Sequence, residues 1–392
     1  MSNYEYLIVG GGMTANAAAK AIRSVDDSGT IAIVGSEEDP PYKRPPLTKQ
    51  LWKGKPIDSI WMKTTELGVD MILGRTVVSL DLANKKVTDD TGVEYGFGKL
   101  LLACGASPRT LPFGGSAIIY YRTVADYRRL ALLAGRDGKF VVIGGGFTGS
   151  EIAAALAMNG KPVTMVFPEP TIGHRAFPAS LAQYVTDYYR GKGVELLTGQ
   201  VPLKIEQSGD DIHVVTENGK DLQALAVIAG LGVTPNVELA QNAGLPVDNG
   251  IVVDEDLTCG HPDVYAAGDV ANFHSVLLDR RMRVEHEDNA LKMGKAAGLA
   301  MAGHGEPFRY QPMFYSDMFE LGYEAVGQLD ATMETVEDWK EPYKEGVVYY
   351  LKEGRVRGVL LWNVWEKVDA AKALIAEPGP FTPADLAGRI TS

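Results

Sequence analysis

The stretch Tyr6-Leu-Ile-Val-Gly10-Gly-Gly12-Met-Thr-Ala15 decides the fold of the first part of the chain. An apolar strand runs into a glycine turn, an alanine-rich helix follows over residues 15–22, and a second apolar strand over 31–34 precedes Glu37. In such a unit the first glycine allows a tight turn, the second lets backbone approach a pyrophosphate, and the third position must be small, as Ala15 is. The pattern therefore predicts a β-α-β dinucleotide-binding unit whose terminal acid, Glu37, accepts hydrogen bonds from a ribose.

The same pattern returns in the stretch Phe140-Val-Val-Ile-Gly144-Gly-Gly146-Phe-Thr-Gly149. A helix over 150–158, a strand over 163–167 and then Glu169 complete this second unit. The start of each helix presents unpaired N–H groups and the positive end of the helix dipole, which favour a phosphate. Because both copies lie between a strand and a helix and both carry the acid, the sequence favours two dinucleotide folds over glycine turns that bind nothing.

Length and composition narrow the class of protein. A chain of 392 residues is long enough for two to three domains, and its 45% hydrophobic and 22% charged residues are ordinary for a globular protein. The net charge of −12 argues against nucleic acid and anionic membranes as partners. No apolar run approaches the roughly 18 residues of a membrane span, and no targeting segment is visible, so we expect a cytoplasmic protein. Cys104, Cys259 and the scattered histidines show no metal-ligand spacing, so we expect no metal site.

Several strands lie outside the two repeats. The stretch Val264-Tyr-Ala-Ala-Gly268-Asp269 is a short apolar strand, and its final acid either reaches a bound ligand or forms an Asx turn. Apolar strands over 100–103 and 225–229 end in glycines near the two linkers, and we interpret them as crossings between domains. The basic loop that contains Arg280, Arg281 and Arg283 is interpreted as a solvated surface, with a docking or dimer contact as the alternative.

The pattern changes from about residue 307. Strands around 323–326, 346–352 and 355–362 and a helix over 364–375 indicate an α+β domain, in which we interpret Tyr350 and Trp365 as core residues. We therefore predict the α/β class, with two Rossmann-like dinucleotide-binding domains and a C-terminal α+β domain. The predicted domains cover residues 1–113 with 246–306, residues 114–245, and residues 307–392.

Taken together and in this order, the motifs resemble those of the flavoprotein reductases that bind two dinucleotides. The resemblance is greatest to the apoptosis-inducing factor branch, beside the rubredoxin and ferredoxin reductases. It extends from Tyr6 to about Ile375, and its distinctive segments are 41–52, 144–151, 232–238, 266–269, 281–286, 313–317 and 362–363. Thr48 replaces the usual Ser, and Tyr315 stands where Trp is common.

The resemblance implies FAD on the first dinucleotide unit and NADH on the second. The residues that it places near FAD are Gly10, Gly12, Ala15, Glu37, Arg44, Lys49, Arg109, Asp269, His286 and Tyr315. Those that it places near NADH are Gly144, Gly146, Phe147, Gly149, Glu151, Glu169, Arg175, Gly232, Glu285 and Asn363, and Val78 completes the cofactor-binding set.

Three residues are expected to serve the reaction itself. Lys49 would stabilise the anionic reduced flavin, Glu151 would hold that lysine and meet the nicotinamide amide, and Phe147 would stack on the nicotinamide. The alternatives are a surface lysine, an acid favoured by the helix dipole and a core phenylalanine. For His286 an ordinary structural histidine remains an equal alternative.

The function implied is an FAD-dependent NADH reductase, an electron-transfer oxidoreductase. Hydride would pass from nicotinamide C4 to flavin N5, and electrons would then pass to rubredoxin or ferredoxin. One alternative acceptor is a quinone or dioxygen. Another alternative is a redox-sensing protein that holds reduced flavin and NAD⁺ in a long-lived complex and forms a homodimer.

Overall fold

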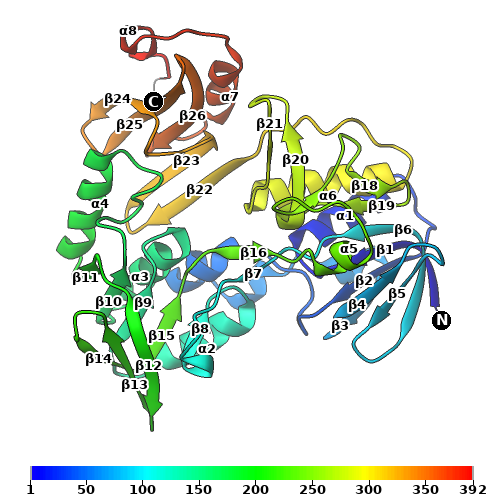
Figure 1. Ribbon diagram of the computed structural model, residues 1–392, viewed down its shortest axis with the longest axis horizontal. Coiled ribbons are helices and arrows are strands. Elements are labelled where there is room, and N and C mark those ends of the chain that lie inside the picture. Colours follow the sequence, from blue (N-terminus) through cyan, green and yellow to red (C-terminus); the bar gives the residue numbers. More distant parts are fainter. Residues whose placement is uncertain (1, 391–392) are drawn as a thin grey trace. The chain divides into compact units, whose positions relative to one another are not determined.

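The computed structural model describes residues 2–390, and these form two compact units (Figure 1). The first unit contains the residues up to Arg44 together with Ile57–Ser107 and Thr234–Pro312. The second contains Pro45–Pro56, Pro108–Val233 and the residues from Met313 onward. The three domains predicted from the sequence have other boundaries: residues 45–56, predicted with 1–113, lie in the second unit, and residues 234–245, predicted with 114–233, lie in the first. The division into three domains stays a prediction.

A parallel sheet built around the first glycine motif forms the centre of the first unit. Its order is β3, β2, β1, β6 and β19, with β18 antiparallel at the far edge. The bounds of these strands and of the long helices are β1 Ser2–Val9, α1 Met13–Arg23, β2 Ile31–Gly35, β3 Asp70–Leu73, β6 Glu94–Leu102, β18 Thr258–His261, β19 Val264–Ala266 and α6 Glu287–Met301. The strand, helix and strand predicted for the first motif are therefore confirmed.

Smaller elements complete the first unit. They are the strands β4 Val77–Asp81, β5 Lys86–Asp89, β17 Ile251–Val252, β20 Ala271–Ser275 and β21 Arg280–Met282, and the helix α5 Glu238–Asn242. Two of the places where the chain passes from one unit to the other carry the short strands β7 Ala106–Pro108 and β16 Val233–Pro235, which pair with each other.

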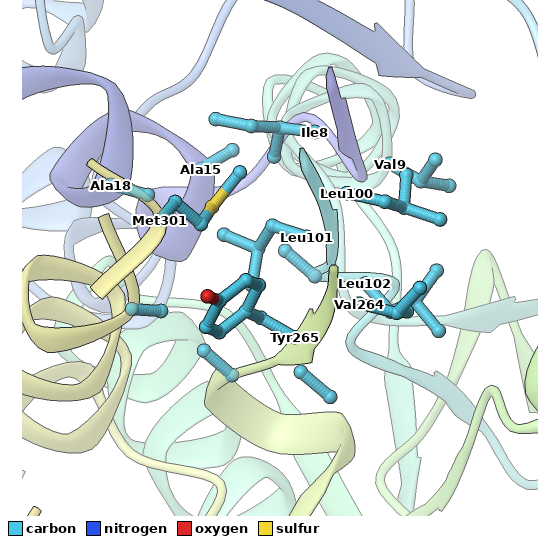
Figure 2. Packing of buried hydrophobic residues seen from close by; sticks show 14 of the residues in the cluster. Ile8, Val9, Ala15, Ala18, Leu100, Leu101, Leu102, Val264, Tyr265 and Met301 are labelled. Carbon is cyan, nitrogen blue, oxygen red and sulfur yellow. The ribbon is translucent and has the colours of Figure 1, made fainter. Parts of the chain in front are cut away.

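The register of the central strands places alternate side chains on opposite faces of the sheet. Leu101 of β6 is the register partner of both Ile8 on β1 and Tyr265 on β19. Figure 2 shows these three side chains on the same side as Ala15 and Met301, which come from the two long helices. All five are buried, so the helices cover this face with apolar contacts.

Helices α1 and α6 approach each other almost backbone to backbone. A Cβ atom on Gly294 would lie 2.5 Å from the carbonyl oxygen of Thr14, and one on Gly298 would lie 2.4 Å from that of Ala18. Glycine at these two positions of α6 therefore sets the distance between the helices.

The second glycine motif forms a parallel sheet in the second unit, in the order β11, β10, β9, β15 and β8. Its elements are β8 Ile118–Tyr120, α2 Val124–Ala134, β9 Phe140–Ile143, α3 Phe147–Met158, β10 Val163–Phe167, α4 Ala179–Gly191, β11 Glu195–Thr198 and β15 Ala226–Ala229. An antiparallel sheet of β12 Pro202–Ser208, β13 Asp211–Thr216 and β14 Asp221–Ala224 is added to it.

The C-terminal part of the second unit is an antiparallel sheet with two helices. Its elements are β22 Met313–Met318, β23 Leu321–Gly327, β24 Glu334–Glu341, β25 Glu345–Lys352, β26 Arg355–Trp362, α7 Val368–Ala376 and α8 Pro383–Leu386. Glu353 and Gly354, with φ of +54° and +71°, form the tight turn predicted between β25 and β26.

Two expectations for the C-terminal part need correction. Helix α7 begins four residues later than predicted, because Glu366, within the predicted helix, has a φ of +62°, outside the right-handed helical region. Trp365 in this connection is 47% exposed, so its interpretation as a core residue is wrong. Tyr350 is buried, as predicted. Within residues 2–390, no helix combines the length and apolar character needed to cross a membrane.

The close approach of α1 and α6 makes a stability prediction. We expect Gly298→Ala to lower the free energy of unfolding by about 1–3 kcal/mol, because the added methyl group meets backbone that cannot move aside easily. Gly191→Ala at the end of α4 is the control, since a Cβ atom there meets nothing within 4 Å. Urea denaturation of both variants gives the comparison, and equal stability of the two would contradict the argument.

Candidate functional site

The first glycine turn leaves room for a phosphate. Gly10 has a φ of +118°, and a Cβ atom there would lie 2.1 Å from the carbonyl oxygen of Ala103. Gly12 is the N-cap of α1, and a Cβ atom there would meet no described atom within 4 Å. Ala15 packs fully buried in the same helix. Among residues 2–390 no side chain caps the helix at Gly12, so its first N–H groups face open space that suits an anion.

Glu37 and Arg44, both expected near FAD, form one cluster with Tyr42. Arg44 donates to one carboxylate oxygen of Glu37 at 2.5 Å, and the Tyr42 hydroxyl donates to the other at 2.5 Å. Burial lowers the pKa of the Arg44 guanidinium, but the charges of Tyr42, Glu37 and Asp269 outweigh it and raise this pKa above its ordinary value. A ribose hydroxyl would therefore meet a carboxylate that is already oriented.

Arg283 contacts one residue expected near FAD, Asp269, and one expected near NADH, Glu285. It donates to the backbone carbonyl of Asp269 at 3.0 Å and forms an ion pair with Glu285, while His286 is the N-cap of α6. The Arg283 side chain is only 9% exposed, so its interpretation as part of a solvated loop is wrong. Its Nε atom is buried and has no partner among the described residues, so a donor remains for a bound group.

The second glycine turn repeats the geometry of the first. Gly144 has a φ of +111°, and a Cβ atom there would lie 2.4 Å from the carbonyl oxygen of Gly230. A Cβ atom on Gly149 would lie 2.1 Å from the carbonyl oxygen of Gly144, so this position must also be glycine. Gly146 caps α3, and a Cβ atom there would meet nothing described within 4 Å. This helix start therefore also fits a pyrophosphate.

A buried ion pair lies beside this helix. Lys49 Nζ is 2.7 Å from Glu151 Oε1, and the two side chains are 6% and 9% exposed. Thr48 donates to Glu151 Oε2 at 2.6 Å, and Ser316 donates to Oε1 at 2.5 Å. Lys49 also lies 5.4 Å from the ring centroid of Tyr315. Removing two charges from water is costly, and these donors supply the hydrogen bonds that make a buried carboxylate tolerable.

Sequence reasoning did not assign a role to Thr48 or Ser316. Each adjoins a residue that it did assign, Lys49 and Tyr315, and this proximity within a motif was the only signal. Short hydroxyl side chains occur throughout loops and strand ends, and their partners become visible only in three dimensions.

Aromatic side chains surround the ion pair and leave one ring partly exposed. Burial, and then the charge of Glu151, raise the pKa values of Tyr189 and Tyr323 well above 10, so both hydroxyls stay neutral. Phe147, at the start of α3, is 41% exposed and lies 5.9 Å from the Phe314 ring. The alternative of a core phenylalanine is therefore wrong.

The acid after β10 has a cationic neighbour. Arg175 donates to Glu169 at 2.8 Å, and the two side chains are 86% and 23% exposed. Such an exposed pair is worth at most about 1 kcal/mol, so it does not prevent Glu169 from accepting another hydrogen bond.

Four further residues of the expected set have structural surroundings of their own. Gly232, with a φ of +82°, accepts a backbone hydrogen bond from Arg109, which is exposed. Asn363 uses its side-chain oxygen on the Gly322 N–H and its amide on the Lys344 carbonyl. Val78 is exposed on β4. Their expected roles at a cofactor remain predictions.

The two cysteines are poorly suited to redox chemistry. Both are free thiols, and burial raises the pKa of each to about 12. The thiolate is the reactive form of cysteine, so neither is activated. Residues 2–390 also contain no group of three or more His, Cys, Asp or Glu side chains that could hold a metal ion.

Comparison with known proteins agrees with this geometry. Residues 4–294 match the family model of the pyridine nucleotide-disulphide oxidoreductases, and residues 297–342 and 337–377 match the C-terminal model of mitochondrion-associated apoptosis-inducing factor. Monodehydroascorbate reductase 3 from Arabidopsis thaliana is 34% identical, over 96% of this chain and 93% of its own length.

Two electron-transfer proteins are similar over almost the whole chain. The ferredoxin–NAD(+) reductase component of the Burkholderia cepacia anthranilate 1,2-dioxygenase system is 31% identical, over 99% of this chain and 98% of its own length. The crystal structure of the covalent putidaredoxin reductase–putidaredoxin complex matches with a TM-score of 0.90 and 30% identity, over 98% of this chain and 95% of that chain. This chain therefore belongs to the pyridine nucleotide-disulphide oxidoreductase family, as an FAD-dependent NAD(P)H oxidoreductase that transfers electrons.

Proposed function

We propose that this protein passes electrons from NADH through FAD to a small electron-carrier protein of the ferredoxin or rubredoxin type. The observation that carries the proposal is the buried Lys49–Glu151 pair beside the open helix start at Gly146. A protein acceptor is supported by the ferredoxin–NAD(+) reductase component and by the putidaredoxin reductase complex, both similar over almost the whole chain.

In this proposal each of the two glycine turns binds one of the two cofactors. FAD would be held at Gly10 and Gly12, with Glu37 on its ribose, and NADH at Gly144 and Gly146. When bound, FAD accepts the hydride of the nicotinamide and then releases the electrons to the acceptor.

The ion pair supplies charge where the reaction needs it. Lys49 would place a positive charge beside the reduced flavin, whose ring is anionic, in a site with little water. Glu151 is held by Thr48 and Ser316 at its two oxygens, so it fixes the ammonium group and presents a defined edge to the nicotinamide amide. Phe147 offers an exposed ring for stacking on the nicotinamide.

The identity of the acceptor is tested by stopped-flow mixing. The protein, reduced anaerobically with NADH, is mixed in separate runs with ferredoxin, rubredoxin, a quinone, monodehydroascorbate or dioxygen. We expect flavin absorbance to return fastest with one of the two carrier proteins. Faster return with any of the three small molecules would contradict the proposal, and slow return with all five would favour the long-lived complex of a redox sensor.

Lys49 has a measurable role in this proposal. We expect Lys49→Met to lower the flavin reduction potential and to slow flavin reduction by NADH roughly tenfold or more, because one charge contact in a water-poor site is worth a few kcal/mol. Lys55→Met, an exposed position in the same segment, is the control and keeps wild-type behaviour. An unchanged potential and rate in Lys49→Met, with FAD retained, would remove Lys49 from the site.

Glu169 predicts a preference for NADH over NADPH. Its carboxylate accepts from a ribose 2′-hydroxyl but repels a 2′-phosphate. We expect kcat/KM to favour NADH in the wild type, and Glu169→Gln to reduce the preference about tenfold, since it removes the repulsion and leaves the Arg175 charge available. Arg175→Ala should leave the preference for NADH in place. A wild-type kcat/KM in favour of NADPH would overturn the assignment.

A further inference from the structure

The loop over residues 169–177, which we call the ribose loop, carries Glu169 and Arg175 after β10. At its first end Glu169 accepts a backbone hydrogen bond from Gly199 at 3.2 Å. In its middle the Gly173 N–H donates to the carbonyl of Gly145 at 3.2 Å, inside the second glycine turn. These bonds hold the start and the middle of the loop to the parallel sheet of the second unit.

The far end of the ribose loop is held by the C-terminal sheet instead. The Ala331 N–H, just before β24, donates to the carbonyl of Arg175 at 2.9 Å. The Tyr350 hydroxyl on β25 donates to the carbonyl of Ala176, the next residue, at 2.7 Å. Two consecutive carbonyls of the loop therefore accept from the C-terminal part of the unit, which begins more than a hundred residues later: one from the connection before β24 and one from β25.

An aromatic contact completes this attachment. The Phe177 ring is buried edge-on against Tyr323, at 5.5 Å between centroids, and against Trp362, at 5.6 Å. Tyr323 and Trp362 are register partners on β23 and β26, and their rings stack at an interplanar angle of 9°. Phe177 thus packs against a stacked pair whose own position is set by strand pairing.

The Tyr350 hydroxyl is well suited to hold the ribose loop in place at any pH. The residue is fully buried, and this burial, with the nearby charge of Glu337 adding to it, raises its pKa far above its ordinary value. The hydroxyl is therefore a donor at every physiological pH. Without it the Ala176 carbonyl loses its side-chain partner, and the adjoining Arg175 is free to shift.

We propose that Tyr350 and Phe177 are positioning residues for the adenosine end of NADH, so that the C-terminal sheet takes part in recognition of the nicotinamide cofactor. They act through the ribose loop, whose Glu169–Arg175 pair they hold in place. This inference rests on the proposed function, in which Glu169 meets the adenosine ribose.

The test compares two adjacent tyrosines with two substrates. Tyr350→Phe removes only the hydroxyl that reaches the loop. Tyr349→Phe is the matched control, because the Tyr349 hydroxyl accepts from the Ile390 N–H instead, and its residue is equally buried. Each variant, loaded with FAD, is reduced by NADH and by reduced nicotinamide mononucleotide, which has the nicotinamide end but no adenosine.

We expect Tyr350→Phe to raise the KM for NADH roughly five- to tenfold, the effect of one lost hydrogen bond, with kcat almost unchanged. The kinetics with the mononucleotide should not change, and Tyr349→Phe should match the wild type with both substrates. Phe177→Leu should repeat the selective effect on NADH at least as strongly.

Two results would overturn the inference. One is an unchanged KM for NADH in both Tyr350→Phe and Phe177→Leu. The other is an equal loss with NADH and the mononucleotide, which would mean a general disturbance of the fold. A wild-type protein that neither substrate reduces would refute the proposed function itself, so the two failures can be told apart.

Discussion

The structure depends on two places where backbone lies so close to backbone that no side chain fits between. The carbonyl of Ala103 faces Gly10, and the carbonyl of Gly230 faces Gly144 in the same manner. In both cases the residue after one parallel strand contacts the glycine turn that follows the neighbouring strand. The helix after that turn then packs over the sheet. The same contact that closes the fold therefore leaves the helix start bare and ready for a phosphate.

The second unit adds a different kind of constraint, a charge pair buried with almost no water. Glu151 belongs to α3, Lys49 to a short segment that precedes it by about a hundred residues, and Ser316 to β22. Three separate segments of one compact unit thus meet at one carboxylate. An unpaired charge at this depth would be strongly destabilising, so each partner requires the others to be in place.

The sequence alone predicted the structure correctly where a periodic apolar pattern coincides with a position that has room only for glycine. The two β-α-β units, their glycine turns and the turn at Glu353–Gly354 follow from apolar strands and from the glycines, which tolerate positive φ. It did not predict the hydrogen-bond partners of short polar side chains when those partners lie far away in the sequence. Nothing local distinguishes Ser316 from other strand serines, or the largely buried Arg283 from the exposed Arg280 three residues earlier on β21. The exposure of Trp365, in a connection where Asn363 and Glu366 have positive φ, was not predictable from the composition.

The state of the cysteines has a consequence for the stoichiometry of the reaction. Both cysteines are free thiols, and burial raises the pKa of each to about 12, so neither offers the reactive thiolate that a disulfide redox pair needs. In the proposed reaction the flavin would therefore be the group that stores the electrons. One NADH transfers one hydride, which reduces the flavin completely. If the carrier accepts a single electron, it must arrive, leave and arrive again before the next NADH is used. This repeated binding favours a weak, short-lived docking contact over a tight one. A carrier that stays bound after it has taken the first electron prevents the transfer of the second electron.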